Sequence, residues 1–351
     1  MGGLATGAPP PVQFYALVAR SRRSPLYSFD TGKHRRPPIM PRLSPWLVVV
    51  AVLLLAALGT ALYALWVVRP LTDRGAGVIP PGLVPSLPET PSGGAQAPAK
   101  LPAFGAGAAS TRPIPGVGAA AGLVVEAESG HVVWMDSPHK QRAIASLTKM
   151  MTALVAVRAH QATGTFVITP AMTDVPGETI GLSAGDRVST RDMLAATLLP
   201  SANDAANALA VHTSGSVTAF VKRMNTTAKT LKLHDTRFSN PSGIYDTGNH
   251  SSAWDIAVLA RQLLATPSLS ALVGRKVYVP RIGPDYVNTN HLLWTYSGAR
   301  GVKTGFTDAS GRCLVAAATR GGRTMIAVVL DAGGDEFTEA SRMLDWGFKH
   351  A

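Results

Sequence analysis

Residues 46–68 form an uninterrupted apolar run of 23 residues that contains no charged side chain. About 20 helical residues cross the hydrocarbon core of a bilayer, whereas a buried core helix is usually shorter and carries polar positions. The run therefore predicts a transmembrane segment. Residues 1–45 carry seven Lys and Arg against one Asp, an asymmetry that predicts a cytoplasmic N-terminus. Everything after residue 68 is then expected outside the membrane.

Two questions about this segment stay open. Gly59-Thr60-Ala61 offers a small-x-small cleavage pattern, so the run could be a cleaved signal peptide. Its length favours an uncleaved signal-anchor instead. Met40 could be the natural start of the chain. Residues 1–39 have no strand or helix period, and we expect residues 1–45 to form a disordered, basic cytoplasmic segment.

Residues 69–118 contain ten prolines and nine glycines, a share typical of low-complexity chain. This composition predicts a stiff linker that holds the following domain away from the membrane. The fold is therefore expected within residues 119–351.

The pattern of this last region predicts strands at both ends and helices between them. Apolar stretches at 123–126 and 131–135 flank Ser129-Gly130 and indicate a hairpin, as do 313–319 and 324–330 around Gly321-Gly322. Helical spacing or caps indicate helices at 146–159, 190–199, 204–212, 217–231, 252–265 and 336–348. We expect an α+β domain whose antiparallel sheet brings the two ends together.

Charge and cysteine content exclude several classes of function. The net charge is +12, but residues 119–351 carry 22 Lys and Arg against 18 acidic residues, without the clustering that binding to nucleic acid requires. Cys313 is the only cysteine, which excludes an internal disulfide framework and a multi-cysteine metal cluster. It lies in an apolar strand, and we expect a core residue rather than a nucleophile.

Two Ser-x-x-Lys pairs could join a hydroxyl and an amine on one helical face. Ser137 and Lys140 lie in a polar stretch that is typical of a solvated turn. Ser146 and Lys149 begin the most strongly apolar helix, where desolvation favours the neutral amine that a general base needs. The second pair is therefore the candidate nucleophile and base.

Two further motifs follow in order. Ser201-Ala202-Asn203 comes 55 residues after Ser146, and by itself it would be an ordinary helix cap. Lys303-Thr304-Gly305 comes 102 residues later. A lysine and a hydroxyl on a strand edge can hold a carboxylate, and the glycine lets another chain approach. The ordered set of three is a much sharper signal than any single motif.

With these motifs, the domain resembles the serine-type D-alanyl-D-alanine carboxypeptidases, the low-molecular-weight penicillin-binding proteins of peptidase family S11. The stretches that carry the resemblance are ASLTKMMTAL from Ala145, SANDAANALA from Ser201, FSNPSG from Phe238 and GVKTGFTDASG from Gly301. The resemblance implies a β-lactamase/D,D-peptidase-like fold, with the antiparallel sheet flanked by helices and an all-helical subregion. It also implies peptidoglycan pentapeptide stems as substrates, β-lactam antibiotics as inhibitors, and neither metal nor cofactor.

The resemblance further implies a role for each matching residue. Ser146 would be the acylated nucleophile, Lys149 its base, and Ser201 a proton relay to the leaving D-alanine. The remaining matches would bind substrate: Asn203 would contact the peptide, Lys303 and Thr304 of the KTG motif would hold the terminal carboxylate, Gly305 would allow close approach, and the N–H groups of Ser146 and Phe306 would form the oxyanion hole.

Several alternative functions fit the sequence less well. Ser183 lies in a GxSxG pattern, but the turn that follows it argues against an α/β-hydrolase elbow. A class A β-lactamase needs a glutamate between its second and third motifs, and none occurs between Glu178 and Glu336. A non-catalytic penicillin-sensing or wall-binding module is disfavoured by the intact motifs. The sequence does not separate a carboxypeptidase from a D,D-endopeptidase.

Overall fold

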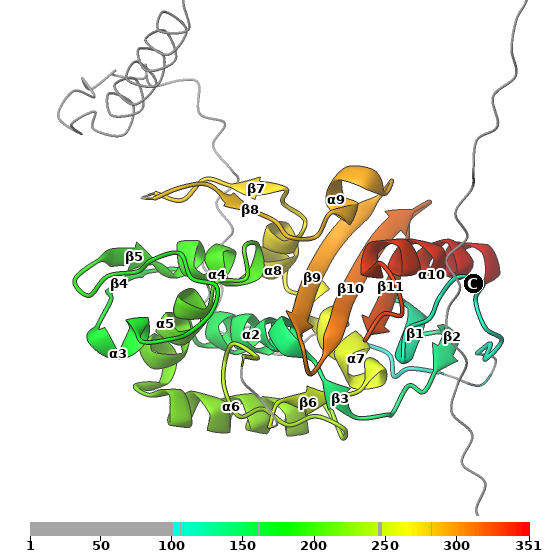
Figure 1. The fold of residues 1–351 in the computed structure, drawn as a ribbon, viewed down its shortest axis with the longest axis horizontal. Coiled ribbons are helices and arrows are strands. Elements are labelled where there is room, and N and C mark those ends of the chain that lie inside the picture. The colour runs from blue at the N-terminus through cyan, green and yellow to red at the C-terminus, as the bar shows by residue number, and fades with distance from the viewer. Residues whose placement is uncertain (1–100, 106, 108, 161, 245–247, 282) are drawn as a thin grey trace, which may run out of the picture. The chain divides into compact units, whose positions relative to one another are not determined.

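The structure, a computed structural model, describes residues 101–105, 107, 109–160, 162–244, 248–281 and 283–351 (Figure 1). The predicted segments 1–45 and 46–68 and most of the predicted linker lie outside these residues. The described part includes nearly all of the domain expected within residues 119–351.

A five-stranded antiparallel sheet in the order β2-β1-β11-β10-β9 joins the two ends of the domain. Its strands are β1 (Ala121–Glu126), β2 (Val132–Asp136), β9 (Ala299–Thr307), β10 (Gly311–Arg320) and β11 (Arg323–Leu330). Both predicted hairpins and the predicted meeting of the two ends are confirmed. The sequence pattern did not predict β9, which lies at one edge.

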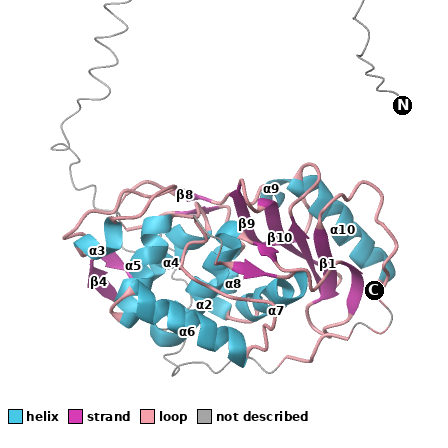
Figure 2. Cartoon of the chain, turned by 60° about the horizontal axis from the view of Figure 1, so that its bottom comes forward, coloured by secondary structure: helices cyan, strands magenta, loops and turns pink. Residues whose placement is uncertain are grey.

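Both faces of the sheet are buried because alternate side chains along each strand enter different cores. Val328 of β11 and Val125 of β1 belong to the larger core, which also holds the helices. Val124 and Val329 point into a second core that α10 (Glu336–His350) covers. The sheet is therefore the middle layer of the domain, with α10 on its outer face (Figures 1 and 2).

The helices gather mainly on the opposite face of the sheet and form an all-helical region beyond it (Figure 2). They are the 3₁₀ helix η1 (Ala145–Thr148), α2 (Lys149–His160), α3 (Pro170–Thr173), α4 (Thr190–Leu198), α5 (Asn203–Ser214), α6 (Val217–Thr230), α7 (Ala253–Leu264) and α8 (Pro267–Val273). The short helix α9 (Leu292–Thr295) instead contributes Leu292 to the core beneath α10. Three two-stranded pairs complete the fold: β3 (Arg142–Ala143) with β6 (His250–Ser251), β4 (Thr165–Val167) with β5 (Arg187–Ser189), and β7 (Val277–Tyr278) with β8 (Tyr286–Val287).

Side-chain caps explain why several helices begin where the sequence predicts. Ser189 Oγ accepts from Asp192 N–H at the start of α4, and Ser252 Oγ accepts from Asp255 N–H at the start of α7. Each bond satisfies a backbone donor that has no partner within the helix.

In the described residues, no single helix has the length and apolar character to cross a membrane. Helices α7 and α8 meet both criteria only when they are taken together, as a pair bent by 105°.

The folded domain begins before residue 119. Gly105 and Ser110 form parallel bridges to His131 and Trp134, and Ile114 is buried in the outer core. A high content of proline and glycine predicts that a segment lacks regular secondary structure. Such a segment can still pack against a folded domain. The C-terminal part of the predicted linker therefore lies along β2.

Arg261 of α7 ties this segment to the domain. The residue is 4% exposed, and its guanidinium donates to the carbonyl oxygens of Ala127, Pro102 (2.6 Å) and Glu128 (2.9 Å). Three charge-assisted bonds from one buried group make this side chain a strong link between distant parts of the chain.

We predict that Arg261→Met lowers the free energy of unfolding by about 2–4 kcal/mol, because three buried carbonyl groups lose a charged donor. Urea denaturation followed by circular dichroism measures the change. Arg300→Met is the control, because Arg300 is exposed and makes no hydrogen bond to the described residues. Equal stability of the two variants would contradict the assigned role of Arg261.

Candidate active site

Ser146 and Lys149 lie one turn apart at the point where η1 passes into α2. The sequence predicted one helix over 146–159, but Ser146 lies in the 3₁₀ turn and Lys149 is the first residue of α2. Side chains three residues apart eclipse one another in a 3₁₀ helix. Lys149 Nζ accordingly lies 2.8 Å from Ser146 Oγ.

The Lys149 amine has two further partners, both of them carbonyl oxygens. Nζ donates to Asn203 Oδ1 at 2.7 Å and to the Ser242 backbone oxygen at 2.9 Å. Carbonyl oxygens can only accept, so a neutral amine gives them its two N–H groups. A neutral amine would then direct its lone pair at Ser146 Oγ, whereas an ammonium would donate a hydrogen bond to it.

The surroundings of Lys149 favour this neutral form. Its side chain is 0% exposed. Burial, and then the charge of Lys303, hold the pKa of Lys149 well below that of an ordinary lysine, while Asp204 acts in the opposite direction. The carboxylate of Asp204 is itself held by backbone N–H groups, including those of Ile180 and Leu182 at 3.1 Å.

The second motif contributes one residue at the start of α5. Asn203 Nδ2 donates to the Pro176 oxygen at 2.8 Å, which orients Oδ1 toward Lys149. Both ends of this amide are therefore engaged by the protein, and its predicted contact with a peptide stays a prediction. Ser201 precedes the helix with φ of 68°, in the left-handed region. Its Oγ is buried without a hydrogen-bond partner among the described residues.

The third motif lies on β9, directly against the nucleophile turn. A Cβ placed on Gly305 would stand 3.2 Å from Ser146 N and 3.0 Å from the Ile144 oxygen. A side chain at this position would have to push the nucleophile turn back by a few tenths of an ångström. Thr304 Oγ1 lies 2.6 Å from Thr289 Oγ1, and Thr289 N–H donates to the Leu199 oxygen beside the second motif.

Lys303 is the second buried lysine of the site, with 1% of its side chain exposed. Its Nζ donates to the Thr304 oxygen at 2.9 Å, its only hydrogen bond to the described part of the chain. Burial lowers the pKa of Lys303 to about 7. Below that pH the site holds a cation with free N–H groups, which suits an anionic partner.

A loop between α6 and β6 supplies the Ser242 oxygen. Thr152 Oγ1 of α2 donates to the Pro241 oxygen at 2.6 Å, next to the bond from Lys149. Asn240 Oδ1 accepts from the N–H groups of Ser242 (3.0 Å) and Gly243 (2.7 Å). A Cβ on Gly243 would lie 1.9 Å from the Ala145 oxygen, so glycine is required at this position.

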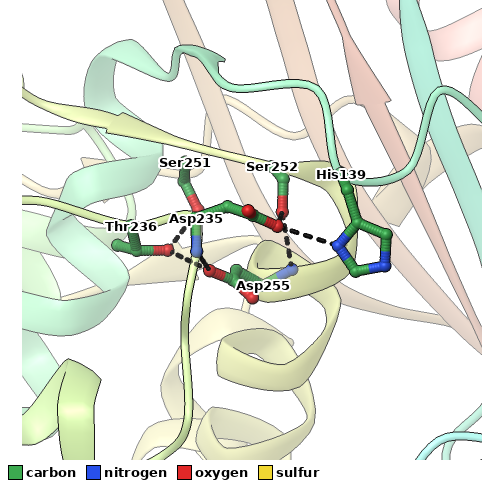
Figure 3. A network of polar contacts seen from close by, with 6 residues as sticks. All are labelled: His139, Asp235, Thr236, Ser251, Ser252 and Asp255. Carbon is green, nitrogen blue, oxygen red and sulfur yellow. Dashed lines mark hydrogen bonds and ion pairs between the residues drawn. The ribbon is translucent and has the colours of Figure 1, made fainter.

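A polar network joins the two ends of this loop (Figure 3). Asp255 Oδ2 accepts from Asp235 N–H and from Thr236 Oγ1, both at 2.7 Å. Asp235 Oδ2 accepts from Ser252 Oγ at 2.9 Å and lies 2.8 Å from His139 Nδ1. The network thus fixes the base of the loop to the start of α7 and to the segment before β3.

The other sequence candidates lie where the sequence predicted. Ser137 and Lys140 occupy an exposed turn, and no helix follows Ser183 directly. Cys313 is fully buried in β10, and its pKa is raised to about 11, chiefly by burial. None of these residues joins the cluster around Lys149.

Sequence reasoning missed three contributors to the site. The Ser242 oxygen is a backbone group, Thr289 is outside every motif, and Asp204 acts on Lys149 through its charge. In the sequence, Ser242 stood out only as part of the FSNPSG stretch, and no chemical role was assigned to that stretch. The oxyanion donors stay predictions, although Phe306 follows Gly305 on β9 and its side chain is exposed.

Comparison with known proteins adds an independent finding. The profile of the D-alanyl-D-alanine carboxypeptidase family, peptidase S11, matches residues 108–334. D-alanyl-D-alanine carboxypeptidase DacF of Bacillus subtilis is 34% identical over 239 residues, which cover 65% of this chain and 61% of that protein. DacD of Escherichia coli is 35% identical over 240 residues, 64% of this chain and 62% of that protein. The chain thus spans about three fifths of the length of these relatives.

Solved structures share the fold. Penicillin binding protein 6B from Escherichia coli has a TM-score of 0.64 and 34% identity, over 68% of this chain and 80% of that one. The Streptomyces K15 DD-transpeptidase has a TM-score of 0.63 and 32% identity, over 68% of this chain and all of that one. The α+β, D,D-peptidase-like fold that the sequence predicted is confirmed.

We predict that Gly305→Ala slows covalent labelling of Ser146 by a fluorescent penicillin roughly 10- to 100-fold, because the added methyl separates β9 from the nucleophile turn. The labelling rate is measured by stopping the reaction at successive times and quantifying the fluorescent band on a gel. Thermal denaturation checks that the variant folds. Gly105→Ala is the control, because a Cβ there meets nothing within 4 Å. Unchanged labelling of Gly305→Ala would show that the close approach of β9 is not needed.

Proposed function

We propose that this chain, which belongs to the D-alanyl-D-alanine carboxypeptidase family, is a serine D,D-carboxypeptidase that removes the terminal D-alanine from peptidoglycan stem peptides. The observation that carries the proposal is the Lys149 amine, buried and hydrogen-bonded to two carbonyl oxygens beside Ser146 Oγ. A non-catalytic sensing module would have no need of a base held in this way.

Acylation follows from that geometry. Ser146 Oγ attacks the carbonyl carbon of the penultimate residue while its proton passes to the neutral Lys149 amine. The carbonyl oxygen becomes an oxyanion, for which the N–H groups of Ser146 and Phe306 are the proposed donors. The closeness of Gly305 to Ser146 N supports this pairing, because it brings the two donors' segments together.

Collapse of the intermediate breaks the peptide bond and expels the amine of the terminal D-alanine, which needs a proton. Ser201 Oγ is the proposed relay for the proton that Lys149 has received. Its buried hydroxyl has no hydrogen-bond partner among the described residues, so it is free to donate and accept in turn. The positive φ of Ser201 costs roughly 1–3 kcal/mol, a strain typical of functional positions.

Lys303 and Thr304 are the proposed binding site for the terminal carboxylate. A buried cation without an anionic partner among the described residues is costly unless a ligand provides one. A substrate that ends in a free carboxylate would supply it. This requirement favours removal of a terminal residue over cleavage within a chain that lacks a nearby carboxyl end.

Deacylation needs water to attack the Ser146 ester, with Lys149 again as the proposed base. A class A β-lactamase uses a glutamate between the second and third motifs for this step, and this chain has none between Glu178 and Glu336. We therefore propose that β-lactams form a slowly released acyl-enzyme. Among the similar proteins are some named as carboxypeptidases, one named as an endopeptidase and one named as a transpeptidase. These activities differ in the leaving group that is released from the peptide or in the acceptor that attacks the acyl-enzyme.

We also propose that residues 46–68 anchor the enzyme with its catalytic domain outside the cytoplasmic membrane, residues 1–45 inside and the Pro/Gly-rich segment as linker. The composition of those segments supports the arrangement. Fractionation of cells that express the full chain or a chain without residues 46–68 tests it. A soluble full-length chain would refute the anchor.

For the activity, we predict that the full chain binds fluorescent penicillin covalently and releases D-alanine from a D-Ala-D-Ala peptide. Ser146→Ala loses both, and Lys149→Ala lowers both at least 100-fold, because the nucleophile loses its base. Mass spectrometry locates the adduct and an amino-acid assay measures D-alanine. Labelling without peptide turnover would favour a sensor, and rapid loss of the antibiotic would favour a β-lactamase.

The two lysines predict a bell-shaped pH dependence of kcat/KM. Activity rises with pH as Lys149, whose pKa is lowered, gives up its proton, and falls as Lys303 loses its charge at about pH 7 in the free enzyme. Lys303→Arg should move the alkaline limb above pH 9, since a guanidinium stays charged. An alkaline limb unmoved in this variant would remove Lys303 as its origin.

A further inference from the structure

A groove of about 550 Å³ lies where the end of α8 meets the start of β9, and Figure 1 shows α8 next to that strand. Three apolar and three polar side chains contribute to its lining: Leu264, Pro267, Ala271, Ser270, Arg275 and Arg300. No residue assigned to the proposed active site lines the groove, and none of its described lining residues is acidic. The groove is therefore a separate, cationic surface.

Arg300 is the first cation at this groove. The five-stranded sheet carries four arginines, and the other three form ion pairs: Arg312 with Glu336, Arg320 with Asp345 and Arg323 with Glu126. Arg300 is exposed, and its side chain makes neither an ion pair nor a hydrogen bond with the described residues. Its guanidinium is thus available to an external anion.

Arg275, shortly after the end of α8, is the second cation. It is half-buried, and its side chain also has no ion pair or hydrogen bond in the described part of the chain. Its charge acts on Tyr278, whose hydroxyl donates to the Asp192 carboxylate at 2.7 Å. The acid on this side of the groove is therefore engaged by a neutral partner and does not neutralise Arg275.

A role as helix caps does not explain these two cations. Basic side chains often serve the carbonyl oxygens that are left free at the end of a helix. At the end of α8, the buried Asn288 serves them instead, because its Nδ2 donates to the oxygens of Val273 at 3.2 Å and of Arg275 at 2.9 Å. These carbonyl groups are thus satisfied without either guanidinium.

Close backbone packing brings the two arginines together although they are far apart in the sequence. A Cβ placed on Gly301 would lie 2.9 Å from the Val273 oxygen, and one on Gly274 would lie 3.5 Å from the Arg300 oxygen. The end of α8 and the start of β9 are therefore in contact, and both side chains extend from a fixed backbone. Cations that are already held around one groove lose less conformational entropy when they bind an anion.

We propose that this groove is a binding site for a phosphate group, which the guanidinium groups of Arg275 and Arg300 hold. Arginine presents paired N–H donors that match two phosphate oxygens. The Ser270 hydroxyl, which makes no hydrogen bond with the described residues, is a further donor at the groove. A bound anion also relieves the repulsion between two like charges. The site goes beyond the proposed carboxypeptidase function and does not depend on it.

Two phosphodiesters test the site and distinguish the sources of the phosphate. Dihexanoylphosphatidylglycerol represents a lipid headgroup, and glycerophosphoglycerol is the same phosphodiester without acyl chains. Isothermal titration calorimetry with the wild-type full chain in a nonionic detergent measures both affinities. We expect dissociation constants of about 1 mM, which increase as salt rises. Tighter binding of the lipid indicates a membrane headgroup as the natural ligand, and equal binding indicates a phosphodiester outside the membrane.

Variants assign the binding to the two arginines. Arg275→Gln and Arg300→Gln should each weaken binding of glycerophosphoglycerol about tenfold, because each removes a charge-assisted contact. Arg237→Gln is the control, since Arg237 is exposed, lies outside the groove and makes no side-chain hydrogen bond with the described residues. It should bind as the wild type does. Thermal denaturation confirms that each variant folds.

Acylation by penicillin separates the groove from Lys303, which lies three residues beyond Arg300 on β9. The acylated chain should bind glycerophosphoglycerol within twofold of the free chain. Loss of binding on acylation would place the phosphate at Lys303 and refute the groove.

Three other results would also overturn the inference: no binding by the wild type, wild-type affinity in both groove variants, or an equal loss in Arg237→Gln, which would reveal a general attraction to positive charge. A chain that binds the phosphodiesters and releases no D-alanine would overturn the proposed function alone.

Discussion

The site depends on the burial of the Lys149 amine, which holds its pKa well below that of an ordinary lysine. An ammonium at this depth would need an anionic partner, because the cost of burying an unpaired charge amounts to several kcal/mol. The structure offers it two neutral carbonyl oxygens and a hydroxyl. These groups satisfy a neutral amine completely. Burial therefore favours the neutral form of this amine, which is the form that the proposed base requires.

Each partner of that amine comes from a different part of the fold. Asn203 begins α5, Ser242 belongs to the loop between α6 and β6, and Ser146 belongs to the turn before α2. Interactions that lie farther away hold these segments in register, notably the carboxylates of Asp235 and Asp255 at the base of the loop (Figure 3). The site is consequently a property of the whole helical region and not of one motif.

The edge strand β9 completes the site from the side of the sheet. Gly305 allows contact with the nucleophile turn, and Lys303 adds a positive charge that further disfavours protonation of Lys149. Burial lowers the pKa of both lysines, and for Lys149 the charge of Lys303 lowers it further.

The sequence alone predicted most of the sheet, most helices, the buried Cys313 and the order of the three motifs, because periodicity and capping are local properties. It did not predict that Ser146 lies in a 3₁₀ turn, that Gly105 and Ser110 pair with His131 and Trp134, or that Ser242 and Thr289 take part. A backbone oxygen is present in every residue, so the amino-acid type does not reveal which one will bind Lys149. An irregular segment that packs on the domain shows no periodic pattern of apolar residues. Tertiary structure alone decided which carbonyl groups face Lys149, because its protonation depends on groups that are close in space and 54 to 93 positions away along the chain.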